Sequence, residues 1–280
     1  MATIKTGTSP QAWRPDVNTF APVDEIPEAL IVQASTLGGK VEGDAPSVRV
    51  AYVTDDDAQF SAEAEVIPES DPVLSEALVH TAKVTQLIKL SMEQYMQPGT
   101  NDQLSTSLKR AITKKANEAF LAQVAPTSPA VAPVAGLLNT TGVVAGDEVT
   151  TNLDPIVDLI AELEANGATP SLIVLDPVGW AAIRKLKTAT GSNESLVGAG
   201  VGDAVQQLLD RRVIVSPSMT VSTGLVIDPT EVISAYGDIN LATSTDAYFN
   251  SDSIAIRATW RLGHVVPRAN RLGTFTIEEA

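Results

Sequence analysis

The chain contains no cysteine and only two histidines, His80 and His264. The lack of cysteine excludes disulfides, thiolate nucleophiles, iron–sulfur clusters and thiolate zinc sites. A zinc site built from three histidines is also impossible within one chain. Neither histidine lies in a motif that would make it the base of a catalytic triad, and we expect His264 to be a structural residue at the end of a strand. The sequence therefore predicts no metal and no cofactor.

Basic residues are scarce as well: 19 lysines and arginines stand against 34 acidic residues, for a formal net charge of −15. A surface of that sign repels phosphate backbones, which disfavours tight nucleic-acid binding by the whole molecule. No apolar run reaches the roughly 18 residues of a membrane span, and the first residues lack a signal-peptide pattern. We expect a soluble, cytosolic chain whose 280 residues form one large domain or two intertwined ones.

Glycine-rich and acidic segments give no catalytic motif. Residues 38–40, Gly-Gly-Lys, lack the upstream glycine and the following hydroxyl residue of a phosphate-binding loop. Residues 198–202, Gly-Ala-Gly-Val-Gly, follow a polar loop and place the third glycine one position too early for a dinucleotide fingerprint. Asp55, Asp56 and Asp57 lack the spacing of a calcium loop, so we interpret them as a solvated turn or a partner for a basic patch. We predict that the chain is not an enzyme.

Residues 1–46 predict an extended arm. They contain five prolines and show no sustained period of 3.6 or 2, so they cannot build a core of their own. They carry too many apolar residues for a linker, which indicates docking on another surface. These residues are Trp13, Phe20, Ile26, Leu30 and Ile31.

Residues 48–67 predict a β-hairpin. In the first strand Val48, Val50 and Tyr52 alternate with other residues. In the second, an apolar set that starts at Phe60 alternates with a polar set that includes Glu63 and Glu65, and Pro68 and Pro72 end the pairing. An isolated hairpin is marginally stable, so this one needs a third surface to lie on.

A long helix is predicted over residues 101–125, capped by Asn101 or Asp102. Its apolar residues recur every four positions, at Leu104, Leu108, Ile112, Ala116 and Phe120. The other faces carry four basic residues, Lys109, Arg110, Lys114 and Lys115. In so acidic a protein, we expect these cations to contact the acidic surface of a neighbour rather than nucleic acid.

The remaining elements alternate in type. Residues 79–95 fit either a strand or a helix start. Asp154 is predicted to cap a helix that ends at Asn166, and Asp176 to cap a second helix after a strand over 171–175. A short helix is expected over 204–209. Further strands are expected over 213–215, 224–227, 232–236, 254–262 and 275–277.

The arm and the hairpin are two segments that cannot be stable alone, which is typical of a subunit that buries them on copies of itself. At this point the chain resembles a tailed-phage major capsid protein of the Hong Kong 97-type fold. The resemblance is carried by the order and spacing of five stretches. They are Ile67–Asp71 with Lys83 to Tyr95, Leu104–Leu121, Gly136–Leu138, Leu175–Lys187 and Leu208–Met219.

The resemblance implies an α+β fold with four parts. They are an N-terminal arm (1–46), an extended loop (47–78), a peripheral domain (79–129 and 241–280, with spine helix 101–125) and an axial domain (130–240). It further implies a virion protein, assembled in the host cytoplasm as pentamers and hexamers of an icosahedral shell. The implied partners are packaged double-stranded DNA contacted non-specifically, a portal and a decoration protein, with no membrane.

Candidate intersubunit contacts combine the apolar arm, the acidic loop and the basic helix. They are Trp13, Phe20, Asp55, Asp56, Asp57, Phe60, Glu63, Glu65, Lys109, Arg110, Lys114 and Lys115.

Two departures from the family pattern affect assembly. Some members weld subunits through a lysine, an asparagine and a glutamate, but the matching positions here are Ile67, a site near Asp252, and Thr259. No lysine occurs from residue 41 to 82, so we expect non-covalent shells. No helical scaffolding domain precedes the arm, which predicts a separate scaffolding protein. The alternatives are an encapsulin-like compartment that houses cargo proteins and, more remotely, a soluble α+β enzyme with a site of dispersed Asp, Glu and Lys residues.

Overall fold

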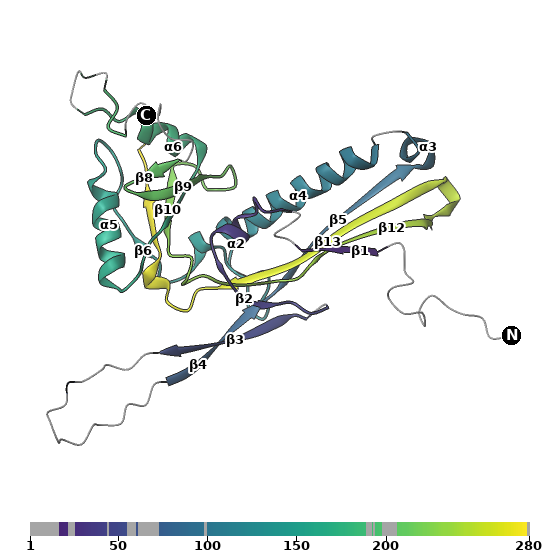
Figure 1. The fold of residues 1–280 in the computed structure, drawn as a ribbon, viewed down its shortest axis with the longest axis horizontal. Coiled ribbons are helices and arrows are strands. Elements are labelled where there is room, and N and C mark those ends of the chain that lie inside the picture. The colour runs from purple at the N-terminus through teal and green to yellow at the C-terminus, as the bar shows by residue number, and fades with distance from the viewer. Residues whose placement is uncertain are drawn as a thin grey trace.

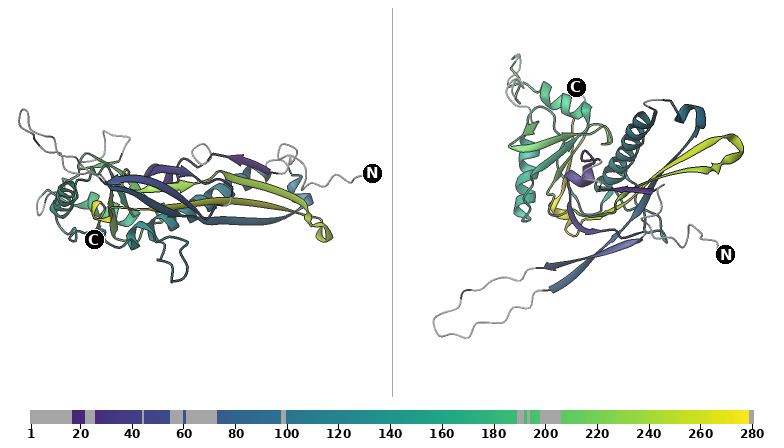
Figure 2. Two further views of the ribbon diagram at one scale, coloured as in Figure 1. Left: turned by 90° about the horizontal axis from the view of Figure 1, so that it is seen from below. Right: turned by 45° about the vertical axis from the view of Figure 1, so that its right-hand side comes forward.

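The computed structural model describes residues 17–21, 26–43, 45–54, 60, 73–97, 100–188, 192, 194–197 and 206–278. These residues form two bodies, each a six-stranded sheet covered by helices, and a two-stranded hairpin that projects from their junction (Figure 1). Turned by 90°, the molecule is elongated and thin (Figure 2). The α+β class implied by the resemblance is confirmed.

The first sheet, called the long sheet here, is organised around one 13-residue strand, β13 (Ser253–Val265). Its order is β1-β12-β13-β11-β2, and β5 pairs with β13 on the other side. The bounds are β1 Val17–Phe20, β2 Thr36–Lys40, β5 Ala82–Ser91, β11 Ile233–Tyr236 and β12 Ile239–Tyr248. The predicted strand over 254–262 is therefore confirmed and extends further at its C-terminal end.

Strand β5 settles the ambiguity at residues 79–95. Its side chains alternate strictly between half-buried and exposed, because one face lies under a helix and the other is open. It pairs with β13 in an unbroken antiparallel register from Ser91↔Ser253 to Ala82↔Leu262. A single helical turn, α3 (Met92–Tyr95), follows it.

Helix α4 (Thr100–Ala122) lies across the long sheet (Figure 1) and confirms the predicted long helix, although it ends three residues earlier than expected. The stripe Leu108, Ile112, Ala116 and Phe120 is almost fully buried, in one core with Trp260 of β13. Past the helix end, the Asn139 side chain donates to the carbonyls of Ala122 and Gln123 at 3.1 and 2.9 Å, which accounts for two of the unpaired carbonyls there.

The second sheet has the order β6-β14-β10-β7-β9-β8. Its strands are β6 Val144–Ala145, β7 Leu172–Leu175, β8 Gln207–Leu208, β9 Arg211–Val215, β10 Thr223–Ile227 and β14 Gly273–Thr276. Helices α5 (Asp154–Ala165) and α6 (Pro177–Lys185) share a core with it. Short 3₁₀ turns lie at Leu137–Asn139 (η3), Phe249–Ser251 (η4) and Ala269–Arg271 (η5).

Two local predictions in this body are wrong. The N-cap of α5 is Leu153, which makes no side-chain cap, and Asp154 is already helical. Residues 207–208 are a strand rather than part of a helix over 204–209, because Leu209 and Asp210 adopt positive φ angles of 51° and 61° and turn the chain back into β9. Asp176, in contrast, caps α6 as predicted.

The arm packs partly on its own chain, which corrects the expectation that its apolar residues need another surface. Ile26, Leu30 and Ile31 are buried in the core under α4. They flank and form the single turn α2 (Leu30–Gln33), whose first amide donates to the Asn117 side chain of α4 at 2.8 Å. Trp13 lies outside the described residues, and Phe20 ends β1, paired in register with Ile239.

The hairpin is real, but its second strand was placed wrongly. Strand β3 (Ser47–Thr54) pairs with β4 (Val73–His80), not with residues 60–66, most of which lie outside the described part. The reason is burial: Ala77 and Val79 of β4 face Val41 and Ala235 in a small core beside the long sheet. The segment that pairs with β3 is therefore the one with a buried face.

A buried ion cluster joins the two bodies. Glu231, just before β11, accepts hydrogen bonds from Arg268 at 2.8 Å and Arg271 at 2.6 Å. Arg271 also donates to the Asn166 carbonyl at the end of α5, at 2.9 Å. The cluster therefore ties the start of a long-sheet strand to the connection that leads into the second sheet.

Candidate intersubunit surface

The outward face of α4 carries the predicted basic residues. Lys114 and Lys115 are exposed and share one counter-ion, Glu118, at 3.9 and 3.5 Å. Arg110 is exposed and Lys109 half-buried one turn earlier. One carboxylate cannot neutralise two lysines, so this part of the helix presents net positive charge in a strongly acidic chain.

The predicted acidic partners lie mostly outside the described residues: this holds for Asp55, Asp56, Asp57, Glu63 and Glu65. Phe60 is described, and its side chain is fully exposed, at 108% of the reference value. Strands β3 and β4, which precede and follow this segment in the chain, project away from both bodies (Figure 1). A phenylalanine left in water forgoes about 1.5–3 kcal/mol of burial free energy.

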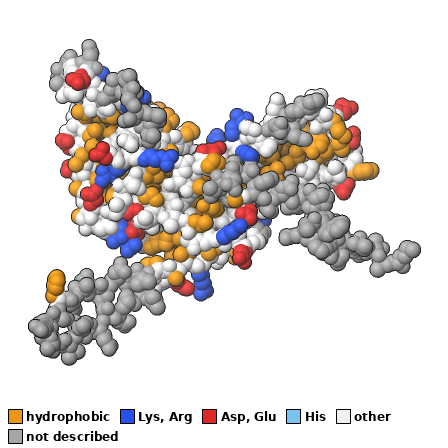
Figure 3. Space-filling model, viewed as in Figure 1, with side chains coloured by type: hydrophobic (Ala, Val, Ile, Leu, Met, Phe, Trp, Pro, Cys, Tyr) orange, Lys and Arg blue, Asp and Glu red, His pale blue; other side chains and the backbone are white. Residues whose placement is uncertain are grey.

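A second exposed apolar group lies at the far end of the long sheet. Met96 after α3 and Phe249 in η4 are 73% and 85% exposed, and the two segments adjoin through a hydrogen bond from the Met92 amide to the Asp252 carbonyl at 3.0 Å. Figure 3 shows hydrophobic side chains gathered over this β12–β13 end. Exposed clusters of this kind mark contact surfaces. The sequence reasoning missed this one because its residues are separated in the chain.

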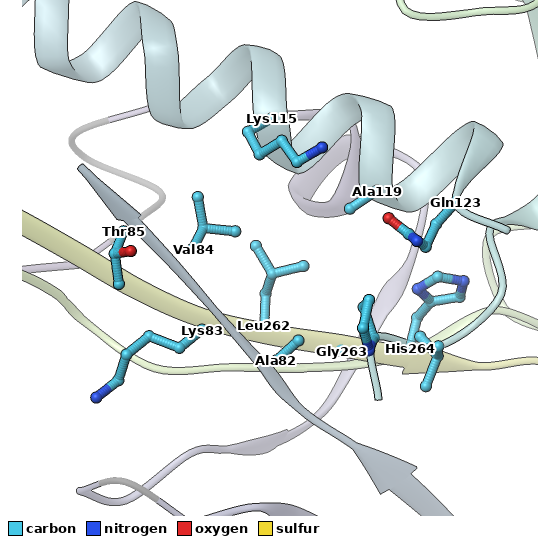
Figure 4. Close-up of a pocket in the computed structure, with 12 residues that line it drawn as sticks. Ala82, Lys83, Val84, Thr85, Lys115, Ala119, Gln123, Leu262, Gly263 and His264 are labelled. Carbon is cyan, nitrogen blue, oxygen red and sulfur yellow. The ribbon is translucent and has the colours of Figure 1, made fainter. Parts of the chain in front are cut away.

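Between α4, β5 and β13 lies a cavity of about 410 Å³, which we call the α4 pocket (Figure 4). Lys115, Ala119 and Gln123 line it from the helix at four-residue spacing, and Val84 and Leu262 line it from the strands. Its walls are mainly apolar. The volume falls within the range of sites that hold a small molecule or a large side chain.

His264 lines one end of this pocket and is buried. Its ring packs edge-on against Phe120. Its two ring nitrogens are buried, and the Ala135 backbone is a polar neighbour of the ring. Burial lowers the pKa of His264 to about 4, and a hydrogen bond with the Ala135 backbone opposes this shift, so the ring is neutral at pH 7. The predicted position of this histidine at the end of a strand is confirmed.

The buried carboxylates of the described residues all have structural partners. Asp176 accepts from the Val178 and Gly179 amides, and Asp228 accepts from the Thr169 amide at 2.7 Å and from Thr230. Glu231 holds the two arginines of the ion cluster. Within the described ranges no group of three His, Cys, Asp or Glu side chains could hold a metal ion.

Comparison with known proteins identifies the class. The model of the phage capsid family matches residues 32–276, which is most of the chain. The chain therefore belongs to the phage capsid family. It is a major capsid protein of the kind that forms the shell of a tailed-phage head, and a component of the virion. No curated protein matches it by sequence.

Solved structures agree on the fold. A chain from Gordonia phage Cozz is 16% identical, with a TM-score of 0.68 over 90% of this chain and 87% of that one. The capsid of a native GTA particle is 17% identical, with a TM-score of 0.65 over 89% and 90%. A chain from Microbacterium phage Oxtober96 is 11% identical, with a TM-score of 0.68 over 99% and 96%. At such low identity the likeness concerns the fold alone.

In the described ranges, no helix combines the length and apolar character that crossing a membrane requires.

Proposed function

We propose that this chain assembles as pentamers and hexamers through non-covalent contacts in which the acidic loop of one subunit lies on the basic face of α4 in the next. The observation that carries the proposal is the excess positive charge at Lys114 and Lys115, which share Glu118 as their counter-ion, beside the exposed Arg110. The loop that would meet it, residues 55–71, contains seven acidic residues and no basic one. Opposite charges at this spacing steer association and fix register.

The four-part division into arm, extended loop, peripheral domain and axial domain accompanies this proposal. The long sheet with α4 would be the peripheral domain, and the second sheet with α5 and α6 the axial domain. The shell would enclose double-stranded DNA and be assembled in the host cytoplasm with a separate scaffolding protein and a portal. The role is structural rather than catalytic, and the phage capsid match supports it over an encapsulin-like compartment.

A charge-reversal experiment tests the contact. Lys114→Glu with Lys115→Glu should abolish or strongly slow assembly, measured by light scattering and negative-stain microscopy in the presence of the candidate scaffold. Combining this double variant with Asp55→Lys and Asp56→Lys should restore particles. As a control, Lys185→Glu on α6 changes charge on the second body, and it should assemble normally.

Two results would contradict the proposal. If the double variant assembles like the unmodified chain, the basic face of α4 is not an assembly contact. If all variants and the unmodified chain remain monomers with scaffold present, the chain does not build a shell under these conditions and the enzyme alternative returns.

A further inference from the structure

We infer that the α4 pocket is the socket for Phe60 of a second copy of this chain. The inference rests on the proposed function, because it requires the loop of one subunit to reach α4 of another. It adds to the charge complementarity one anchoring side chain, Phe60, and the pocket that receives it.

The size and the mainly apolar walls of the α4 pocket fit an aromatic side chain. The pocket, at about 410 Å³, exceeds the volume of one phenylalanine, so it can take the ring together with part of the adjoining backbone. Its walls come from Ala119, Val84 and Leu262. Among the exposed large hydrophobic side chains of the described residues, Phe60 has the highest exposure.

The charges around Phe60 and around the α4 pocket are complementary. Lys115 extends over the pocket from α4 (Figure 4), and Lys114 and Arg110 continue the basic face beside it. Phe60 stands between Asp55–Asp57 on one side and Glu63 and Glu65 on the other. A loop laid with its acidic residues on the basic face would bring the aromatic ring to the apolar opening between them.

His264 adds an aromatic group to the wall of the pocket. Its two ring nitrogens are buried and expose almost no surface to the pocket, so an occupant would meet the ring through its carbon atoms. Phe120 already packs edge-on against this ring, and a second phenylalanine could make the same kind of contact from the pocket side. This wall therefore favours an aromatic occupant.

The phenylalanine that enters the pocket should come from another chain. In its own chain Phe60 is fully exposed. The strands β3 and β4 lead away from α4, while β5, the direct continuation of β4, forms one wall of the pocket. Heterologous contacts of this type, in which one surface of each copy meets a different surface of the next, generate closed rings.

Site-directed disulfides can test the inference because the natural chain has no cysteine. Two single-cysteine chains, Phe60→Cys and Ala119→Cys, are assembled together and oxidised, and non-reducing denaturing gels are run. Since a disulfide requires Cα atoms within about 7 Å, we expect a dimer band from the mixture that neither chain gives alone. Leu87→Cys is the matched control, because Leu87 lies on β5 but on its exposed opposite face.

A second variant pair measures the contribution of the ring. Phe60→Ala should raise the subunit concentration needed for assembly by about tenfold or more, whereas Phe60→Leu should recover most of the loss. Ala119→Trp, which fills the pocket, should act like Phe60→Ala, and in the Ala119→Trp background Phe60→Ala should cause little further change.

The outcomes separate the inference from the proposed function. Shells that form without a Phe60–Ala119 cross-link, or that cross-link equally well through Leu87, overturn the inference and leave the shell contact intact. A cross-link from Trp13→Cys to Ala119→Cys in its place assigns the pocket to the N-terminal arm and also overturns it. Failure of the unmodified chain to assemble contradicts the proposed function and this inference together.

Discussion

The ring of His264 meets the ring of Phe120 edge-on, with centroids 5.0 Å apart and planes inclined by 67°. The contact joins the inner face of β13 to the last turns of α4, at the closed end of the α4 pocket. A neutral imidazole fits there as an aromatic group, but an imidazolium would place an uncompensated charge in an apolar wall.

This contact predicts a loss of stability in acid. The pKa of His264 is about 4 in the folded chain and 6.5 when unfolded, so the unfolded state binds the proton more readily. Stability should therefore fall as the pH drops from about 6.5 to about 4, by about 3 kcal/mol from this residue, and level off below. Urea unfolding of the unassembled subunit at pH 7 and pH 4 measures it. His264→Leu should lose less stability over that interval; equal losses in both chains would contradict the assignment.

The ion cluster between the two bodies predicts that removal of one carboxylate, that of Glu231, lowers the stability of the fold substantially. Glu231→Ala leaves Arg268 and Arg271 without their shared buried partner, and the free energy of unfolding should fall by about 2 kcal/mol or more. Glu118→Ala is the control, because Glu118 pairs with two lysines on an exposed helix face and should change stability by about 0.5 kcal/mol or less. Similar effects from the two substitutions would show that the buried cluster is not a stabilising junction.

Two aspartates at helix starts should contribute differently to the stability of the fold. Asp176 accepts from the amides of Val178 and Gly179 at 2.9 and 3.1 Å, so Asp176→Ala should destabilise the chain by about 1 kcal/mol or more. Asp154 lies inside the first turn of α5, where it makes no cap; it interacts with the helix dipole and accepts from the Asn152 amide group, so Asp154→Ala should cost about half as much or less. Thermal unfolding of both variants would reveal the order, and the reverse order would refute it.

Assembled particles should dissolve into single chains when boiled in detergent, with one band near 29.4 kDa. The family resemblance places Ile67 and Thr259 at the cross-linking lysine and glutamate positions, and neither side chain can take part in that chemistry. Ile67→Lys alone should also give a single band, because Thr259 still stands at the glutamate position. A ladder of covalent multimers from the natural chain would disprove this prediction.

Elements with a strong pattern of their own were predictable. The alternation along β13 and the four-residue spacing along α4 each specify one apolar face. In the structure both faces are buried in the same core. Strand β12 was not predicted, because most of its side chains are polar or small and exposed, and it is a strand only because β13 offers it a partner.

The pairing of β3 with β4 and the lining of the α4 pocket depend on contacts between distant residues, which the local sequence pattern does not reveal. Residues 60–66 alternate strictly and residues 73–80 do not, yet β3 pairs with the second segment, whose Ala77 and Val79 are buried together with Val41. The α4 pocket draws on three separate segments, at 82–85, 115–123 and 262–264, with Pro133 and Val134 closing one side. Two of its polar lining residues, Lys115 and His264, stood out in the sequence, but nothing there indicated that they line one pocket.

The course of β4 into β5 has a mechanical consequence. The two strands run on in nearly the same direction through Thr81 (Figure 1), where the Arg261 side chain donates to the Thr81 hydroxyl at 3.1 Å and its carbonyl at 3.3 Å. A pull on the projecting hairpin is thus directed along β5, parallel to β13. The hydrogen bonds between β5 and β13, from Ser91↔Ser253 to Ala82↔Leu262, are then loaded in shear. In that geometry they resist together instead of breaking one at a time. Force that reaches a subunit through the projecting hairpin would therefore act along the direction in which the long sheet resists extension best.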